Sequence, residues 1–230
     1  AVARLLEVPV VLISIGGIGR PIDEIALNRV FFANYGVSLK GALINKVLPE
    51  KKSLVEKYVS IGLTRQQLSL LGVIPYVPVL AHPTVGQVFE TVKGKLLVGG
   101  ERMRQQVLNV LVGAMTPRHA LDYFRPGSLL ITPGDREDII LAALSHSSTM
   151  STGSPMISGI VLTGGLAPHK TILELLVRSN LPTLLSTEGT YEVASMVHSM
   201  EVKVRAEDTE KVEIARRLVA ENVRVEELFN

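Results

Sequence analysis

The sequence is dominated by a repeated half-unit, in which a short apolar run enters a glycine-bearing turn and then a helical pattern. Residues 127–144 and 159–176 both have this form, with turns at 132–136 and 163–165. Apolar residues recur at helical spacing after each turn. A strand that feeds a helix through a tight turn is the repeating half of a parallel sheet, so the sequence predicts an α/β fold.

Parallel strands bring their following loops to one edge of the sheet, beside helix N-termini that favour anions. We therefore expect the turns of these units to meet there. A third unit, with its turn at 186–190, adds hydroxyl groups. The candidate ligand-binding residues are Asp135, Arg136, Thr163, Gly164, Gly165, Ser186 and Thr187. In this interpretation Arg136 grips an anion through a bidentate contact, and the glycines leave room for the ligand.

A purely structural interpretation of the same residues stays open. Asp135 is in position to cap the helix that follows it, and Arg136 to form a surface pair with Glu137 or Asp138. Gly164 and Gly165 are needed in any case if the turn has positive φ angles.

Composition restricts the class of protein. Hydrophobic residues make up 47% and charged residues 20%, as in compact globular proteins. The 24 basic and 22 acidic residues form no basic stripe, which argues against nucleic acid despite a pI of 8.9. No apolar run reaches the roughly 18 residues that cross a bilayer. With no secretory signal either, we expect a protein of the cytosol or of the soluble phase of an organelle.

Metal and cysteine chemistry are also disfavoured. The chain has no cysteine, and its five histidines show no metal-ligand spacing. We find no nucleophile–base motif, and the serine-rich segment 145–154 predicts a loop long enough to act as a lid.

The first part of the chain predicts half of a doubly wound sheet. Strands are expected at 8–15, 39–47 and 72–75, the first two buried on both faces, with helices at 21–35 and 51–69. Because the chain opens on a fragment of helix and strand, we expect the front of this domain to lie outside these residues.

The second part begins after a linker expected near residues 93–102. A strand at 107–112 is followed by units that start near 127, 157 and 181. The stretch 207–223 is an amphipathic helix with Val212, Ala215, Leu218 and Val219 on one stripe, predicted to pack on the sheet or on a second subunit. We expect a homodimer through this part of the chain.

Asp135-Arg136 and Thr163-Gly164-Gly165 resemble the signature of the DRTGG domain, from about residue 104 to the C-terminus. That family is an accessory module, similar in outline to regulatory CBS domains and found beside enzymes. The resemblance implies a regulatory role.

Residues 8–28, 41–47 and 72–85 resemble the later half of the dethiobiotin synthetase-like P-loop domain at the N-terminus of some phosphate acetyltransferases. That resemblance implies a nucleotide base beside Asn45 and Pro75. No G-x-x-x-x-G-K-[S/T] occurs, however, so the phosphate cradle is absent from these residues. The expected domains are therefore 1–98, a P-loop-like part without the Walker A segment, and 104–230, a DRTGG domain.

These observations predict a regulatory or ligand-sensing module that binds a nucleotide, such as ATP, or a small anion, and that dimerises. No residue of this chain is assigned a catalytic role. Two alternatives stay open: a fragment of an ATP-dependent dethiobiotin synthetase-like ligase, or a fragment of phosphate acetyltransferase. In both, the catalytic segment lies outside this chain.

Overall fold

The chain divides into two compact units, which are described one at a time. The computed structural model describes residues 2–147 and 155–229. Unit 1 consists of residues 1–80 together with 204–230, and unit 2 of residues 81–203. The boundary expected at 98–104 therefore lies inside unit 2. The C-terminal helix, expected in the second domain, belongs to unit 1.

Unit 1 contains a three-stranded parallel sheet in the order β1-β2-β3. Its elements in chain order are α1 (Val2–Leu5), β1 (Val10–Ile15), α2 (Gly19–Asn34), β2 (Leu39–Val47), η1 (Pro49–Lys51), α3 (Lys52–Thr64), β3 (Ser69–Pro75), α10 (Thr209–Asn222) and α11 (Glu226–Phe229). The helix α4 (Pro78–Ala81) lies at the boundary between the units. The predicted alternation of strand and helix is confirmed.

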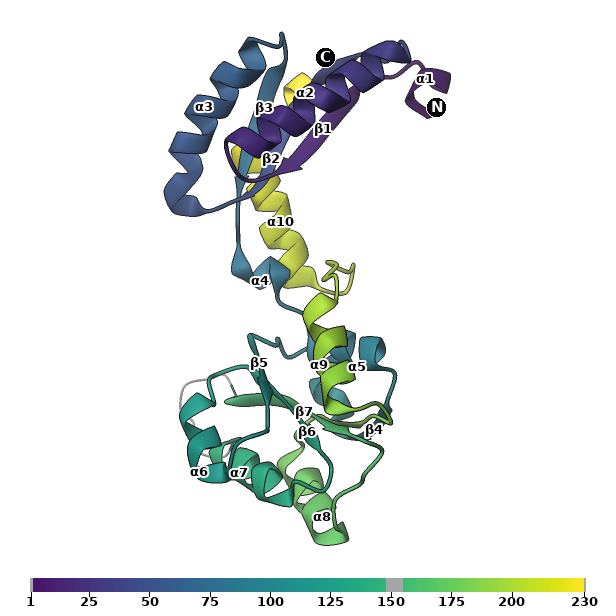
Figure 1. Cartoon of the computed structure of the whole chain (residues 1–230), viewed down its shortest axis with the longest axis vertical. Helices are drawn as coiled ribbons and strands as arrows, with labels where there is room; N and C mark the ends of the chain where they lie inside the picture. Colours follow the sequence, from purple (N-terminus) through teal and green to yellow (C-terminus); the bar gives the residue numbers. More distant parts are fainter. Residues whose placement is uncertain (1, 148–154, 230) are drawn as a thin grey trace. The chain divides into compact units, whose positions relative to one another are not determined.

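Helices α2 and α3 cover the same face of this sheet, where Ile25 and Val59 pack on Ala42 and Ile44 (Figure 1). A right-handed crossover places its helix on one face when successive strands are added in one direction. On the opposite face, Val223 from the end of α10 packs on strand residues of β2 and β3. The carboxyl ends of the strands consequently share one edge of the sheet.

Strand β1 is only partly covered, although the sequence predicted burial on both faces. Ile13 and Ile15 are 66% and 67% exposed. The reason is that β1 is an edge strand, while the C-terminal segment packs mainly on β2 and β3, at Leu43 and Leu71. The apolar run was correctly predicted as a strand, but the predicted burial on both faces was wrong.

The other edge of the sheet is joined by the C-terminal segment. Val223 forms an antiparallel bridge with Gly72, and the Arg224 amide donates to the Leu71 carbonyl at 2.9 Å. A Cβ at Gly72 would lie 2.2 Å from the Asn222 carbonyl oxygen, so only glycine fits at this crossing. Residues more than 140 positions apart in the sequence thus complete one unit.

Unit 2 contains a five-stranded sheet in the order β4-β8-β7-β6-β5. Its elements are α5 (Val85–Val92), β4 (Lys95–Val98), η2 (Gly100–Arg102), β5 (Asn109–Val112), α6 (Pro117–Ala120), η3 (Leu121–Tyr123), β6 (Ser128–Pro133), α7 (Glu137–Ser147), β7 (Ile157–Thr163), α8 (Lys170–Ser179), β8 (Thr183–Leu185) and α9 (Thr190–Ser199). Strands β5 to β8 are parallel, and β4 is antiparallel to β8.

Helices cover both faces of this sheet. On one face, Ile139 and Ile140 of α7 and Leu176 of α8 pack on the strands. On the other, α5 and α9 pack on residues such as Leu129 and Val161 (Figure 1). Burial on both faces explains why β6 and β7 are continuous apolar runs. The predicted α/β architecture is confirmed.

The segment expected to be a linker is part of unit 2. Residues 95–98 form the edge strand β4, and α5 precedes it. None of the helices among the described residues is long and apolar enough to cross a membrane.

Candidate functional site

Three loops meet at the carboxyl edge of the unit 2 sheet, as the sequence predicted. They follow β6, β7 and β8. The Gly134 amide donates to the Thr163 carbonyl at 3.3 Å, which joins the first two loops. The amides of Gly164 and Gly165 donate to the carbonyls of Glu188 and Ser186, both at 2.8 Å, which joins the second and third. Backbone hydrogen bonds therefore hold the candidate residues in one place.

Gly134 allows the first two loops to approach each other. A Cβ built on it would lie 1.6 Å from the Leu166 carbonyl oxygen, far inside van der Waals contact. No other residue fits there without moving the loop after β7. Gly134 therefore has a structural role that the sequence did not single out.

Gly164 and Gly165 both have positive φ angles, 76° and 68°. Other residue types are strained in this conformation, so the turn needs glycine whether or not a ligand binds. Both glycines are exposed. Space is available beside Gly165, because a Cβ placed there would meet only Thr187 Cα, at 3.9 Å.

The Arg136 guanidinium is held by groups of its own unit. Its Nε and one terminal nitrogen donate to the two carboxylate oxygens of Asp138 at 2.9 and 3.1 Å. Its terminal nitrogens also donate to the carbonyls of Gly113 and Met115, at 3.3 and 2.8 Å. Arg136 thus fastens the loop after β5 to the start of α7.

This pairing shifts the pKa values of both Asp138 and Arg136. The hydrogen bond from Arg136 lowers the pKa of Asp138, and the hydrogen bond to Asp138 raises the pKa of Arg136. The Asp138 side chain remains 46% exposed and that of Arg136 30% exposed. Because the pair is open to solvent, an incoming anion can compete with Asp138 for the guanidinium.

Asp135 is exposed, and its charge contributes to the raised pKa of Arg136. The neighbouring Glu137 makes a bond that the sequence did not predict. Its carboxylate accepts from the His169 amide at 2.7 Å, linking α7 to the loop before α8. His169 in turn caps α8, since its Nδ1 accepts from the Thr171 amide at 3.3 Å.

The predicted hydroxyl groups are divided between the interior and the surface. Thr163 and Ser186 are each 1% exposed. Thr163 Oγ1 lies 2.7 Å from Thr190 Oγ1, and Ser186 Oγ accepts from the Glu188 amide at 3.1 Å. Thr187 is exposed. The first two therefore shape the turns, and Thr187 is the hydroxyl that can reach a ligand directly.

The surface of this edge consequently offers a defined set of groups. It combines the glycine turn, the Thr187 hydroxyl and the partly exposed guanidinium with the N-termini of α7, α8 and α9. Backbone turns, hydroxyls and arginine are the groups with which proteins bind phosphate and carboxylate.

The candidates in unit 1 also lie at a carboxyl edge. Asn45 is near the end of β2, and Pro75 ends β3. The two strands are neighbours there, since Val47 pairs with Pro75. The Asn45 side-chain oxygen accepts from the Lys46 amide at 2.8 Å, and Lys46 has a positive φ of 58°. The two candidates thus lie near the carboxyl ends of adjacent strands.

Two further predictions concern lids and metals. Residues 148–154, which carry most of the predicted lid, lie outside the described residues. Within 2–147 and 155–229, no group of three or more histidine, aspartate or glutamate residues has an arrangement that holds a metal ion.

Several contacts that shape the candidate site were not predicted from the sequence. The carbonyls of Gly113 and Met115 hold Arg136, and sequence alone gives no signal for such contacts. Gly134 did carry a signal, because it lies in the turn that follows an apolar strand. The link between Glu137 and His169 depends on how two loops are placed, which sequence spacing does not reveal.

Known proteins resemble this chain over most of its length. The phosphate acetyltransferase of Nitrosomonas europaea is 28% identical over 211 residues, which cover 89% of this chain and 30% of that protein. The phosphate acetyltransferase of Nitratidesulfovibrio vulgaris is 33% identical over 159 residues, 68% of this chain and 22% of that protein. The chain therefore spans less than a third of the length of these relatives.

One solved structure covers 93% of this chain, at 17% identity and a TM-score of 0.44. It contains the CBS and DRTGG domains of the regulatory region of Clostridium perfringens pyrophosphatase, complexed with the activator diadenosine tetraphosphate.

Residues 87–200 match the DRTGG domain family. This range lies within unit 2 and includes all three loops of the candidate site. The chain therefore contains a DRTGG domain, and over most of its length it is related to a part of bacterial phosphate acetyltransferases.

Proposed function

We propose that unit 2 is a regulatory module that binds a small anion or the phosphate of a nucleotide at the carboxyl edge of its sheet. The meeting of the loops after β6, β7 and β8, fastened by the amides of Gly134, Gly164 and Gly165, carries this proposal. The exposed members of the site are Asp135, Gly164, Gly165 and Thr187, with Arg136 half-buried beside them.

In this proposal Arg136 exchanges partners when the ligand binds. The anion replaces Asp138 on the guanidinium, while the carbonyls of Gly113 and Met115 keep the side chain in place. A guanidinium held in this way binds an anion without losing much side-chain freedom. Because Arg136 also holds the loop after β5, its change of partner is transmitted to that loop. The module can pass on ligand binding in this way.

Calorimetric titration of the full chain tests the proposal, with ATP, ADP, AMP, acetyl phosphate and inorganic phosphate as probes. Arg136→Ala should weaken binding by about 1.5–3 kcal/mol, the range for hydrogen bonds to charged groups. The matched control is Arg125→Ala. Arg125 also donates to two backbone carbonyls, those of Asp122 and Phe124, but it precedes β6 at the opposite edge of the sheet.

Equal loss of binding in the two arginine variants would refute this role for Arg136. Failure of every probe to bind the wild-type chain would refute the proposal as a whole.

A second candidate is that the chain is a working part of a longer enzyme, such as a phosphate acetyltransferase or a ligase of the dethiobiotin synthetase kind. The uncovered apolar surface of unit 1 favours it. In addition to Ile13 and Ile15, the outer side of α2 exposes Leu27 and Phe31 by 74% and 56%. A helix that is apolar on both its inner and outer sides is normally buried.

This candidate predicts that other polypeptide covers β1 and α2. The segments of the Nitrosomonas europaea phosphate acetyltransferase outside its 211 matched residues can be expressed separately and mixed with this chain. Protection of the β1 amides against hydrogen exchange by one of these segments would support the candidate. Unchanged exchange with every segment would contradict it. Asn45 and Pro75 remain the proposed contacts of a nucleotide base in such an assembly.

A further inference from the structure

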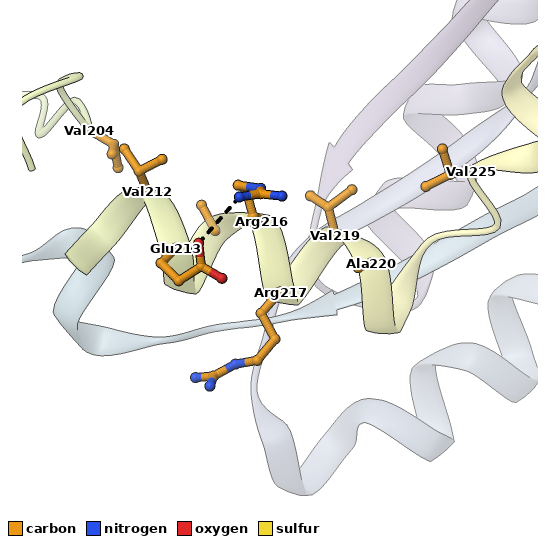
Figure 2. A pocket seen from close by; sticks show the side chains of 9 residues that line it. Val204, Val212, Glu213, Arg216, Arg217, Val219, Ala220 and Val225 are labelled. Carbon is orange, nitrogen blue, oxygen red and sulfur yellow. Dashed lines mark hydrogen bonds and ion pairs between the residues drawn. The ribbon is translucent and has the colours of Figure 1, made fainter. Parts of the chain in front are cut away.

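One face of α10 is apolar and open. It forms a groove in unit 1 with a volume of about 700 Å³. Val204, Val219 and Val225, 40%, 42% and 38% exposed, line this groove with Val212 (Figure 2). The sequence had placed Val212 and Val219 on one stripe with Leu218. In the structure that stripe is divided, because Leu218 is half-buried while Val219 faces the groove.

Charged side chains border the valines on one flank of the helix. Glu213, Arg216 and Arg217 all line the groove, and Arg216 pairs with Glu213 at 3.4 Å (Figure 2). The side chain of Glu213 is 71% exposed and that of Arg216 is 77% exposed, so both can exchange partners.

The pattern along α10 is symmetric about its middle. Val212 and Val219 lie on either side of Ala215 and Arg216, at nearly equal distances along the helix. Glu213 and Arg217 likewise lie two positions before and two positions after Ala215, with opposite charges. If a second α10 helix packs antiparallel to the first about a two-fold axis near Ala215, each of these residues faces its counterpart in the second helix.

We infer that α10 binds α10 of a second copy of this chain, antiparallel and about a two-fold axis near Ala215. In that arrangement Val212 of one copy contacts Val219 of the other, twice. The acidic Glu213 of one copy meets the basic flank at Arg216 and Arg217 of the other, also twice. Ala215, with its small side chain, lets the two helices approach at the centre.

This pairing is independent of the ligand site in unit 2, so either proposal can fail alone. One helix from each copy buries little surface, which predicts a weak dimer that depends on concentration. Light scattering and sedimentation of the full chain over a concentration series measure it.

Val219→Asp should weaken the dimer about tenfold or more, because it places two carboxylates in the apolar contact. The matched control is Val177→Asp on α8, a valine that is 60% exposed in unit 2. Association that survives Val219→Asp, or a wild-type chain that stays monomeric throughout the series, would overturn the inference.

Charge reversal gives the sharper test. Glu213→Arg makes the flank wholly basic, and the double variant Arg216→Glu/Arg217→Glu makes it wholly acidic, so each variant alone should be monomeric. Mixed together, they should form a heterodimer, since each then meets the opposite charge. Because all three side chains lie on the surface, folding should not change, and circular dichroism checks this. A mixture that stays monomeric overturns the proposed antiparallel pairing.

Discussion

At the scale of single residues, the candidate site depends on glycines for two different reasons. Gly164 and Gly165 are required by their positive φ angles, whereas Gly134 is required by the Leu166 carbonyl beside it. The first requirement is conformational and the second is steric. Different substitutions separate the two.

We expect Gly165→Ala to destabilise unit 2 by about 1–2 kcal/mol, from the strain of a side chain at positive φ. Gly165→Asn should cost less, since asparagine tolerates this conformation better than other residues. Gly134→Ala should cost more than both, because its methyl group collides with backbone. Native-state hydrogen exchange of β6 and β7 amides measures the change for unit 2 alone.

Gly100 supplies the control for this series, since a Cβ there meets only a Leu96 methyl group at 3.5 Å. Gly100→Ala should be nearly neutral. Equal costs for Gly165→Ala and Gly165→Asn would show that the positive φ is not the cause.

A pH dependence follows from the lowered pKa of Asp138. A carboxyl whose pKa is lower in the folded state stabilises the fold fully above its unfolded pKa, about 3.9 for aspartate. That contribution disappears as the pH falls through the lower, folded value. The stability difference between wild type and Asp138→Asn should therefore be constant near neutral pH and shrink in acid below about pH 4.

Hydrogen exchange at β6, compared across pH for the two proteins, measures this difference. The effect should be small, because the pair of Asp138 and Arg136 is exposed to solvent. A difference that persists unchanged in strong acid would mean that the Asp138 charge is not its source.

At the scale of secondary-structure elements, the sequence predicted most of the fold because the buried strands carry a simple signal. β2 was predicted with its observed bounds, Leu39–Val47, and β6 and β7 within a few residues. The edge strand β4 was assigned to a linker, since its short, half-exposed sequence between glycines resembles a surface crossing. Pairing of β4 with β8 is a long-range contact, which local pattern does not encode.

Helix α5 was also missed, although its start carries a recognisable signal. Thr84 and Gln87 form a capping box: the Gln87 amide donates to Thr84 Oγ1 at 3.2 Å, and Gln87 Oε1 accepts from the Thr84 amide at 3.0 Å. The T-x-x-Q spacing predicts such a start. The prolines and valines around it, however, favour a loop when the sequence is considered alone.

Gln87 should matter more than Thr84 for the stability of this helix. Thr84→Ala removes one half of the box, at a cost of about 1 kcal/mol. Gln87→Ala also removes the donor to the Lys203 carbonyl, at 2.9 Å, and opens a buried site, so its cost should be clearly larger. Hydrogen exchange of the α5 amides compares the two variants. Equal costs would show that the bond to Lys203 contributes nothing.

At the scale of the whole molecule, the sequence predicted the location of the candidate site better than it predicted the contacts within the site. The meeting of three loops follows from parallel topology, which the alternation of strand and helix reveals. The fixing of Arg136 by Gly113 and Met115 depends on the path of the loop after β5. The return of the C-terminal helix to unit 1 was not predictable either, because its amphipathic pattern fits more than one partner surface.

This return predicts the effect of a truncation. A chain that ends at Lys203 loses Val223 from the sheet face and the bond from the Arg224 amide to Leu71. Loss of one buried valine alone removes about 1.5–3 kcal/mol of burial energy. We expect the β3 amides to lose protection against hydrogen exchange while those of β6 and β7 keep theirs. Retained protection of β3 would show that the C-terminal segment does not stabilise unit 1.

The bond from Gln87 to Lys203 shows that the chain enters and leaves unit 2 at neighbouring points. Unit 2 is therefore an insertion whose folding closes a loop of roughly 120 residues for unit 1, a closure that costs a flexible chain about 4 kcal/mol of entropy. Whatever stabilises the folded insertion lowers that cost for the pieces on either side. If the proposed ligand binds the DRTGG domain, we expect it to stabilise the sheet of unit 1 through chain connectivity alone.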